Sequence, residues 1–265
     1  MAPKTIVMSL GGSLIAPADI DINFLKKFKK VILDFTNQGN KVILICGGGN
    51  TSRFYQKAAK AVSPKVAATD LDWVGIGATK LNAELVSAIF GDKAYESILG
   101  NPAKKVKTNR KIIIGAGYRP GSSSDLDAVL AALAFGAKTV INLSNITYVY
   151  NKDPRKFKDV KPQKKMNWKE FKKIVGNKWI PGAHVPFDPV ASRLAAARGM
   201  KLVVMKGSDL NNLKKFLSDK SFKGTIVSWP RTYFTHHSFS RQSFLLNKIG
   251  RLIQPVISKI GAGFT

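Results

Sequence analysis

The chain has 265 residues, 45% of them hydrophobic, which is enough to bury a substantial core as one large domain or two smaller ones. Its 43 Lys and Arg against 16 Asp and Glu give a formal charge of +27, a balance that attracts polyanions. The basic residues are scattered and are not interleaved with the aromatic or Gly-Phe motifs of nucleic-acid-binding proteins, so we expect a solvated basic surface and no specific nucleic-acid partner. Phosphorylated metabolites and weak, non-specific RNA contact remain open as partners.

Short β-branched runs alternate with longer amphipathic stretches along the chain. The runs that read as strands are residues 5–10, 41–46, 111–117, 138–143, 201–205 and 224–228. The amphipathic stretches are residues 22–38, 51–62, 123–136, 188–199 and 210–217. Strand followed by helix, repeated in this way, predicts an α/β fold with a mostly parallel sheet that helices cover on both faces.

The single cysteine, Cys46, leaves no second thiol for a disulfide within the chain, which favours a reducing compartment. No stretch approaches the roughly 20 consecutive apolar residues of a membrane span, and the first residues lack the layout of a secretory signal. We therefore expect a cytoplasmic protein.

Three glycine-rich turns directly follow predicted strands, at Ser9–Leu14, Cys46–Arg53 and Gly115–Asp125. The carboxyl ends of parallel strands share one edge of the sheet, so the three turns are predicted to converge. Missing Cβ atoms let backbone N–H groups approach an anion, and the following helix adds its positive end. One such turn is more often a plain turn, but three on one edge predict a phosphate site. The P-loop, dinucleotide-binding and protein-kinase signatures do not match these turns.

Several blocks, in order from Lys4 to Ser228, resemble the UMP kinases of the amino acid kinase family, nearest the shorter archaeal type. They are "LGGSL", "GGGNTSRFY", "DWVGIGATKLNA", "PGSSSDLDA", "SNITYVYNKDP", "FDPVASRLAA" and "FKGTIVS". The resemblance implies a three-layer α/β/α sandwich and an enzyme that converts ATP and UMP to ADP and UDP in pyrimidine nucleotide synthesis. It also implies Mg²⁺, which enters with ATP, and a homohexamer.

The resemblance assigns the first two turns to the transferred phosphoryl group and to ATP. Its catalytic residues are Gly12, Gly49 and Arg53, whose planar guanidinium suits phosphate oxygens. The residues that it assigns to ATP are Gly12, Ser13, Gly49, Arg53, Ser144, Asn145, Tyr150 and Asp153. Simpler interpretations stay open, with Arg53 on a solvated helix face, Tyr150 as half-buried packing and Asp153 as a turn former before a proline.

The resemblance assigns the acceptor nucleotide to the second turn, to a helix start and to the third turn. Asp72 would take a ribose hydroxyl and Gly75 would allow close approach, although Asp72 could instead cap the helix. The residues assigned to UMP are Gly48, Asp72, Gly75, Tyr118, Arg119, Pro120, Gly121, Ser122, Ser123 and Ser124. The chain's three histidines, His184, His236 and His237, have no nearby Cys or acidic spacing, so we expect no protein metal site.

Two departures from the family leave other functions open. Ser9 stands where many members have a lysine, and Thr147 and Tyr148 stand where an acid and a glycine are common. A nucleotide-binding protein with weakened or no catalysis is therefore one alternative. The other is a kinase of another small acid or phosphate, such as isopentenyl phosphate. Such a kinase would be expected to carry a histidine in the segment that follows the glycine triplet, where this chain has none.

The sequence divides into a kinase domain at residues 1–228 and an extension at residues 229–265. The extension has five basic residues and no acid, and its apolar residues from Phe244 to Ile260 recur at helical spacing around a break expected at Pro255. Such a basic amphipathic segment would suit an anionic membrane surface or another subunit. A tail with no role is the alternative.

Overall fold

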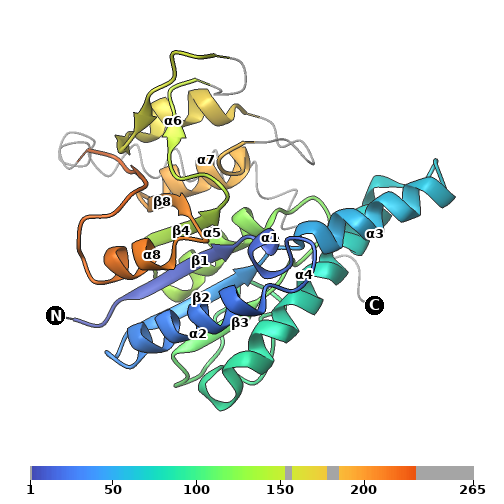
Figure 1. The fold of residues 1–265 in the computed structure, drawn as a ribbon, viewed down its shortest axis with the longest axis horizontal. Helices are drawn as coiled ribbons and strands as arrows, with labels where there is room; N and C mark the ends of the chain where they lie inside the picture. Colours follow the sequence, from blue (N-terminus) through green and yellow to red (C-terminus); the bar gives the residue numbers. More distant parts are fainter. Residues whose placement is uncertain (1, 153–156, 178–184, 231–265) are drawn as a thin grey trace.

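A seven-stranded sheet forms the middle layer of the protein (Figure 1). The computed structural model describes residues 2–152, 157–177 and 185–230. The strands lie in the order β3 (Ile112–Gly115), β2 (Lys41–Cys46), β1 (Thr5–Leu10), β4 (Thr139–Ser144), β8 (Lys201–Lys206), β9 (Thr225–Val227) and β7 (Lys165–Met166). All neighbouring pairs are parallel except β8 with β9. The predicted α/β fold with a mostly parallel sheet is confirmed.

Helices cover both faces of this sheet. One core contains side chains of α2 (Ile22–Thr36), α4 (Ala68–Phe90) and α8 (Leu210–Leu217). The other contains side chains of α5 (Ser124–Phe135), α6 (Trp168–Val175) and α7 (Pro189–Ala197). The architecture is therefore the three-layer α/β/α sandwich that the resemblance implied. A separate two-stranded sheet pairs β5 (Val149–Tyr150) with β6 (Pro162–Gln163), and a short 3₁₀ turn, η1, spans Gly91–Lys93.

The central strands are apolar along their length because both of their faces are buried. On β1, Val7 lies in the core with α5 to α7, whereas the next residue, Met8, lies in the core with α2, α4 and α8. On β2, Ile43 and Leu44 divide in the same way. This alternation follows from the two-residue period of a strand. Its result is a rigid sheet whose carboxyl edge positions the loops that follow.

The helix α3 (Gly49–Val62) differs from the other long helices. None of its residues is buried, and it projects at one end of the molecule alongside the start of α4 (Figure 1). Its apolar side chains Phe54, Tyr55 and Val62 are exposed rather than packed on the sheet. The first turn of α3 nevertheless starts directly at the sheet edge, because β2 ends at Cys46.

The chain continues past β9 onto the body of the domain. The Trp229 indole N–H donates to the Ala196 carbonyl oxygen at 2.8 Å, and the Lys172 ammonium lies 6.0 Å from the centre of the Trp229 ring. Trp229 therefore packs between α6 and α7. The rest of the predicted extension, from residue 231 onward, lies outside the described residues. In the described part of the chain, no helix has the length and apolarity to cross a bilayer.

Candidate active site

The first two glycine turns meet backbone to backbone. A Cβ atom at Gly12 would lie 2.3 Å from the backbone nitrogen of Gly49 and 2.4 Å from the Gly47 carbonyl oxygen. Gly49 has a φ of +60°, and a Cβ there would lie 2.3 Å from the Gly12 carbonyl carbon. Only glycine fits both positions. The predicted convergence of these turns is confirmed, and we call Gly12 with Gly47–Gly49 the glycine core.

The N-terminus of α3 lies at the glycine core. Gly48 caps α3, and the helix begins at Gly49. The first N–H groups of a helix have no carbonyl partner inside it and carry the positive end of the helix dipole. These donors lie where the β1 turn touches the β2 turn, a geometry suited to a phosphate.

A buried amide that the sequence reasoning missed holds the glycine core in shape. The Asn82 amide nitrogen donates to the carbonyl oxygens of Gly47 at 2.8 Å and Gly48 at 3.3 Å, and its side chain is 2% exposed. These bonds provide both carbonyl oxygens with a hydrogen-bond donor. Asn82 lies in the segment "DWVGIGATKLNA", in which the sequence prediction assigned roles to Asp72 and Gly75.

The helix α4 places four polar or small residues on one face. Asp72, Gly75, Thr79 and Asn82 follow one another at steps of three, four and three residues, which keeps them within a narrow arc of a helix. This spacing is the signal by which Thr79 and Asn82 could have been found. The helix starts at Ala68, a turn before Asp72, so the alternative that Asp72 caps the helix is wrong.

Gly75 serves close packing between helices. A Cβ at Gly75 would lie 2.9 Å from the Gln56 amide nitrogen and 3.1 Å from the Ser52 hydroxyl, both on α3. Gln56 in turn donates to the Leu71 carbonyl oxygen at 2.8 Å. The close approach at Gly75 in this structure is therefore to α3, which seats the start of α3 against α4.

Arg53 lies one turn into α3 and is exposed. Its guanidinium donates to the Asn50 side-chain oxygen, through Nε at 3.0 Å and also through Nη2. Arg53 thus lies near the glycine core, and its guanidinium is bound to Asn50 of the same helix. An open hollow of about 470 Å³ lies here, lined by Ala18, Asn50, Thr51, Arg53, Phe54, Tyr55 and Lys57.

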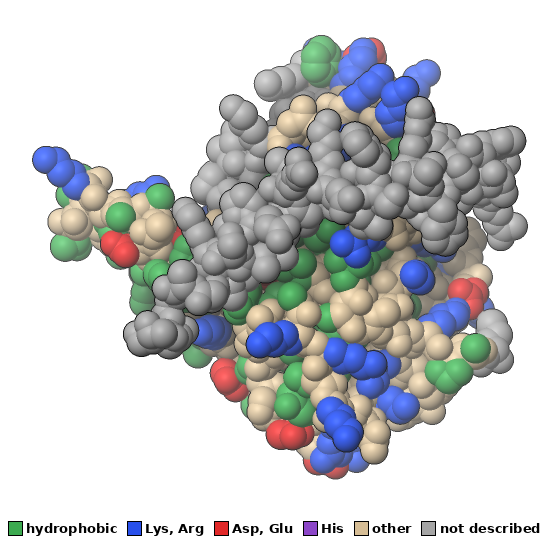
Figure 2. Space-filling model, turned by 180° about the vertical axis from the view of Figure 1, so that it is seen from behind, with side chains coloured by type: hydrophobic (Ala, Val, Ile, Leu, Met, Phe, Trp, Pro, Cys, Tyr) green, Lys and Arg blue, Asp and Glu red, His purple; other side chains and the backbone are tan. Residues whose placement is uncertain are grey.

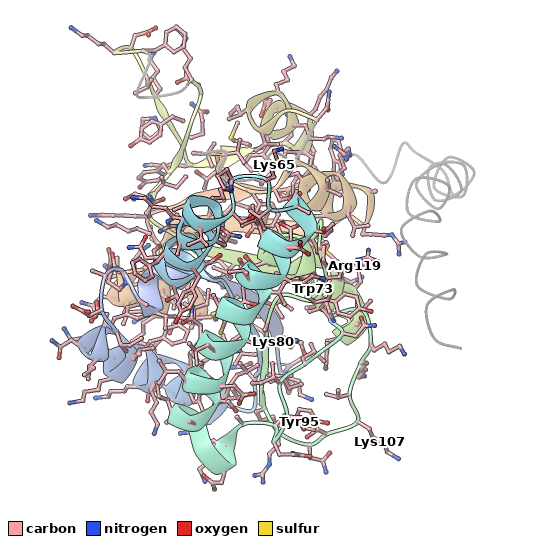
Figure 3. The ribbon with its side chains drawn as sticks, turned by 90° about the vertical axis from the view of Figure 1, so that its right-hand side faces the viewer. Lys65, Trp73, Lys80, Tyr95, Lys107 and Arg119 are labelled. Atoms are coloured by element: carbon pink, nitrogen blue, oxygen red, sulfur yellow. The ribbon has the colours of Figure 1, made fainter. Side chains whose placement is uncertain are left out.

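The third turn, which we call the acceptor loop (residues 117–123), crosses from β3 to α5. The Gly117 N–H donates to Thr79 Oγ1 at 2.8 Å, and the Gly121 N–H donates to Asp72 Oδ2 at 2.8 Å. Both acceptors lie on α4, so the loop lies along the same helix face as the glycine core. Figure 3 views the molecule from this side, with Trp73 of α4 and Arg119 of the loop labelled.

The three serines of this segment are not equivalent. Ser122 Oγ donates to Asp127 at 2.7 Å, and Ser123 Oγ donates to Asp188 at 2.8 Å while capping α5. Their hydroxyl protons are therefore already engaged. Among the described residues, Ser124 Oγ has no hydrogen-bond partner, and it lies 3.6 Å from where a Gly47 Cβ would be. Of the three predicted serines, Ser124 is the one free to donate to a phosphate.

Pro120 and the remaining loop residues form the outer part of the acceptor loop. The Arg119 guanidinium carbon lies 5.8 Å from the centre of the Tyr118 ring, and the Tyr118 hydroxyl accepts from the Asn101 amide at 3.1 Å. Gly121 has a φ of +74°. This left-handed turn reverses the chain and returns it to Ser122.

Two acids of α5, the half-buried Asp125 and the fully buried Asp127, lie next to the acceptor loop, and the sequence prediction assigned neither a role. Asp125 accepts from Ser9 Oγ at 2.9 Å and from the Asp188 N–H at 3.1 Å. Burial raises the pKa of Asp125 to about 7, and the nearby Asp188 carboxylate adds to this, against the opposing Ser9 hydrogen bond. Burial likewise raises the pKa of Asp127 to about 6, against the hydrogen bonds from Ser122 and Tyr118. Ser9 is therefore a partner of the half-buried Asp125 carboxyl group.

Most of the remaining predicted ATP residues lie at the end of β4 and beyond it, and Ser13 lies after β1. Ser144 ends β4, beside the β1 turn, and its hydroxyl accepts from the Ile146 N–H at 3.4 Å. Asn145 follows and is exposed, and Tyr150 is half-buried in β5 opposite Pro162. Ser13 lies in the short helix α1 (Gly12–Ile15). Asp153 lies outside the described residues.

The surface and the thiol add little chemistry of their own. Figure 2 shows Lys and Arg spread over the described part of the face opposite that of Figure 1.

Burial raises the pKa of the Cys46 thiol to about 12, so this group next to the glycine core is not a nucleophile. In residues 2–152, 157–177 and 185–230, no three His, Cys, Asp or Glu side chains are grouped to hold a metal ion. The histidines of the sequence prediction lie outside these ranges.

Comparison with known proteins gives one consistent result. The family model described as "Amino acid kinase family" matches residues 4–206. The chain is 33% identical over 227 residues to the uridylate kinase of Methanospirillum hungatei, covering 84% of this chain and 94% of that protein. It is 30% identical over 226 residues to the uridylate kinase of Sulfurisphaera tokodaii, covering 84% and 98%. The crystal structure of uridylate kinase from Archaeoglobus fulgidus superposes with a TM-score of 0.73 at 26% identity, covering 84% of this chain and 99% of that one.

Proposed function

The chain belongs to the amino acid kinase family, and from this premise we propose that it is a UMP kinase, which transfers the γ-phosphoryl group of ATP to UMP. The observation that carries the proposal is the glycine core. Two strand-ending turns touch through their backbones at the N-terminus of α3, with the acceptor loop on the neighbouring face of α4. This arrangement provides one place for phosphate groups and an adjoining place for a nucleoside.

The reaction requires little from side chains. The second pKa of a phosphate monoester is about 6, so the acceptor oxygen is anionic at neutral pH without a general base. Catalysis then consists of aligning acceptor and donor and of stabilising charge on the transferred group. Gly12 and Gly49 supply backbone positions for this purpose, and Arg53 supplies a cation one turn away. The half-buried Asp125 is not needed as a base.

The two substrates would occupy opposite sides of the glycine core. We assign ATP to the side of β4, with Ser13, Ser144, Asn145 and Tyr150, and we keep Asp153 in that set on the resemblance alone. We assign UMP to Gly48, Asp72 and the acceptor loop through Ser124. Asp72 Oδ2 accepts from the Gly121 N–H, which leaves the second carboxylate oxygen of Asp72 for a ribose hydroxyl.

The remaining assignments follow from the same proposal. Mg²⁺ enters as the MgATP complex and adds positive charge at the transferred phosphoryl group. We further propose a cytoplasmic homo-oligomer, a hexamer by the family resemblance, and a kinase domain at residues 1–228. The extension from residue 229 onward is proposed as an addition to that domain, in contact with an anionic membrane surface or another subunit.

A coupled assay of ADP release tests the proposal. Purified protein with ATP and Mg²⁺ is offered UMP, CMP, dUMP and isopentenyl phosphate in parallel. We expect the highest kcat/KM with UMP. Equal values for UMP and CMP would defeat the uridine assignment, and a preference for isopentenyl phosphate would replace the acceptor. ATP binding without turnover of any acceptor would identify a nucleotide-binding protein that has lost catalysis.

A further inference from the structure

We propose that Asp127 is a positioning residue that holds the acceptor loop in the shape that receives UMP, an inference that rests on the proposed function. Asp127 lies in the first turn of α5 and is 0% exposed. It is absent from the residues assigned above to either substrate. Its two carboxylate oxygens are directed at the acceptor loop.

Asp127 joins the two ends of the loop. Its Oδ2 accepts from the Tyr118 N–H at 3.2 Å, and its Oδ1 accepts from Ser122 Oγ at 2.7 Å. A carboxylate can accept at both oxygens at once, so one side chain fixes both the entry and the exit of the turn. The residues between these two ends are the ones assigned to the nucleotide.

The loop has further anchor points. On α4, Thr79 holds Gly117 and Asp72 holds Gly121. Ser123 Oγ donates to Asp188, and the Ser122 N–H closes the turn on the Arg119 carbonyl oxygen at 3.2 Å. Asp72 is partly exposed and has a proposed ligand of its own, whereas Asp127 is fully buried. Among these anchors, Asp127 is the side chain that binds both ends of the loop.

A role in helix stability alone does not explain this acid. Ser123 already caps α5 by accepting from the Leu126 N–H at 3.2 Å, so the first turn of the helix does not need Asp127 as its cap. The residues that follow, Ala128 and Val129, are fully buried and apolar. An enclosed carboxylate is unfavourable in such surroundings unless hydrogen bonds compensate it, and both of its bonds go to the acceptor loop.

The test compares Asp127→Asn with wild type and with Val129→Ala. Asparagine keeps the size of the side chain but provides one acceptor oxygen in place of two. We expect the KM for UMP to rise about tenfold to a hundredfold, the range for loss of a hydrogen bond to a charged group, with the KM for ATP within about twofold. Val129→Ala destabilises the same helix without touching the loop, so it should leave both KM values near wild type.

Amide hydrogen exchange of the peptide that covers residues 116–123, measured without ligands, separates this inference from the proposed function. Faster exchange in Asp127→Asn than in Val129→Ala is the expected result. Equal exchange and an unchanged KM for UMP would overturn the positioning role. Faster exchange together with no UMP turnover by the wild-type protein would support the anchor and refute the proposed function alone. Ser122→Ala, which removes one of the two bonds, should reproduce part of the effect and add little to Asp127→Asn.

Discussion

The glycine core and the acceptor loop lie side by side along α4 but are built differently. The glycine core depends on the absence of side chains, since the backbones of Gly12 and Gly49 are in direct contact. The acceptor loop is held by side chains, because Asp72, Thr79 and Asp127 accept hydrogen bonds from its backbone and its Ser122 hydroxyl. Under the proposed function, the first arrangement receives the phosphate groups and the second receives the nucleoside.

The largest effect is expected from adding a methyl group to the glycine core. In Gly49→Ala the new Cβ would overlap the Gly12 backbone at a φ of +60°, so we expect a loss of about 2–5 kcal/mol in the free energy of unfolding, and loss of activity. Gly121→Ala is the matched control, because Gly121 also has a positive φ, of +74°, but nothing within 4 Å of an added Cβ. It should cost about 1–2 kcal/mol. Chemical denaturation measures both, and equal losses would contradict the close contact.

The next effect separates charge from scaffold within the glycine core. Arg53→Ala should lower kcat by about 10²–10³-fold, the usual cost of removing a group that stabilises a developing charge, while the Tm stays within a few degrees of wild type. Stability is spared because Arg53 is exposed and, among the residues that the structure describes, bonds only to Asn50 of its own helix. Lys57→Ala, an exposed cation one turn further along α3, is the control for general loss of positive charge. Near-normal turnover of Arg53→Ala would place this residue on the solvent face.

A smaller effect distinguishes the regions by pH, because burial raises the pKa of Asp125 and Asp127, which lie next to the acceptor loop. The pKa of Asp125 is raised to about 7 in the folded protein, from an ordinary value of 3.8. Between these pH values the folded state holds a proton that the unfolded state has released, so stability falls as the pH rises through this window. We expect the free energy of unfolding to drop by about 1–3 kcal/mol more from pH 5 to pH 8 in wild type than in Asp125→Asn. Parallel pH profiles for the two proteins would contradict the raised pKa.

The smallest effect concerns the chain beyond both regions. A protein that ends at Pro230 keeps Trp229 and its hydrogen bond to Ala196, whereas one that ends at Ser228 loses it. We expect the shorter protein to be less stable by about 1–2 kcal/mol, from one hydrogen bond and part of an indole surface. Both should phosphorylate UMP normally, since neither truncation removes a residue of the glycine core or of the acceptor loop. Loss of turnover in a folded protein ending at Pro230 would show that the removed segment completes the site.

The sequence by itself determined six strands of the central sheet in their chain order, its mostly parallel character and the position of all three glycine turns, but not β7 or α6. Each of these follows from local rules, because apolar periodicity fixes the type of an element and parallel strands present their carboxyl ends at one edge. The same rules predicted that the turns at Gly12 and Gly49 would converge. The antiparallel placement of β9 against β8 was not predicted, because nothing local to "GTIVS" encodes the direction of its neighbour.

Only the tertiary structure decided which groups hold the site. The bonds from Asn82 to Gly47, from Gly121 to Asp72 and from Tyr118 to Asp127 join residues 35, 49 and 9 positions apart in the chain. The structure also shows that the Ser122 and Ser123 hydroxyl protons go to Asp127 and Asp188, which leaves Ser124 as the serine free to donate. A donor at one place in the sequence does not specify which acceptor the fold will bring to it. Hydrogen bonds of this kind depend on how helices seat on the sheet, and the packing of the two cores sets that seating.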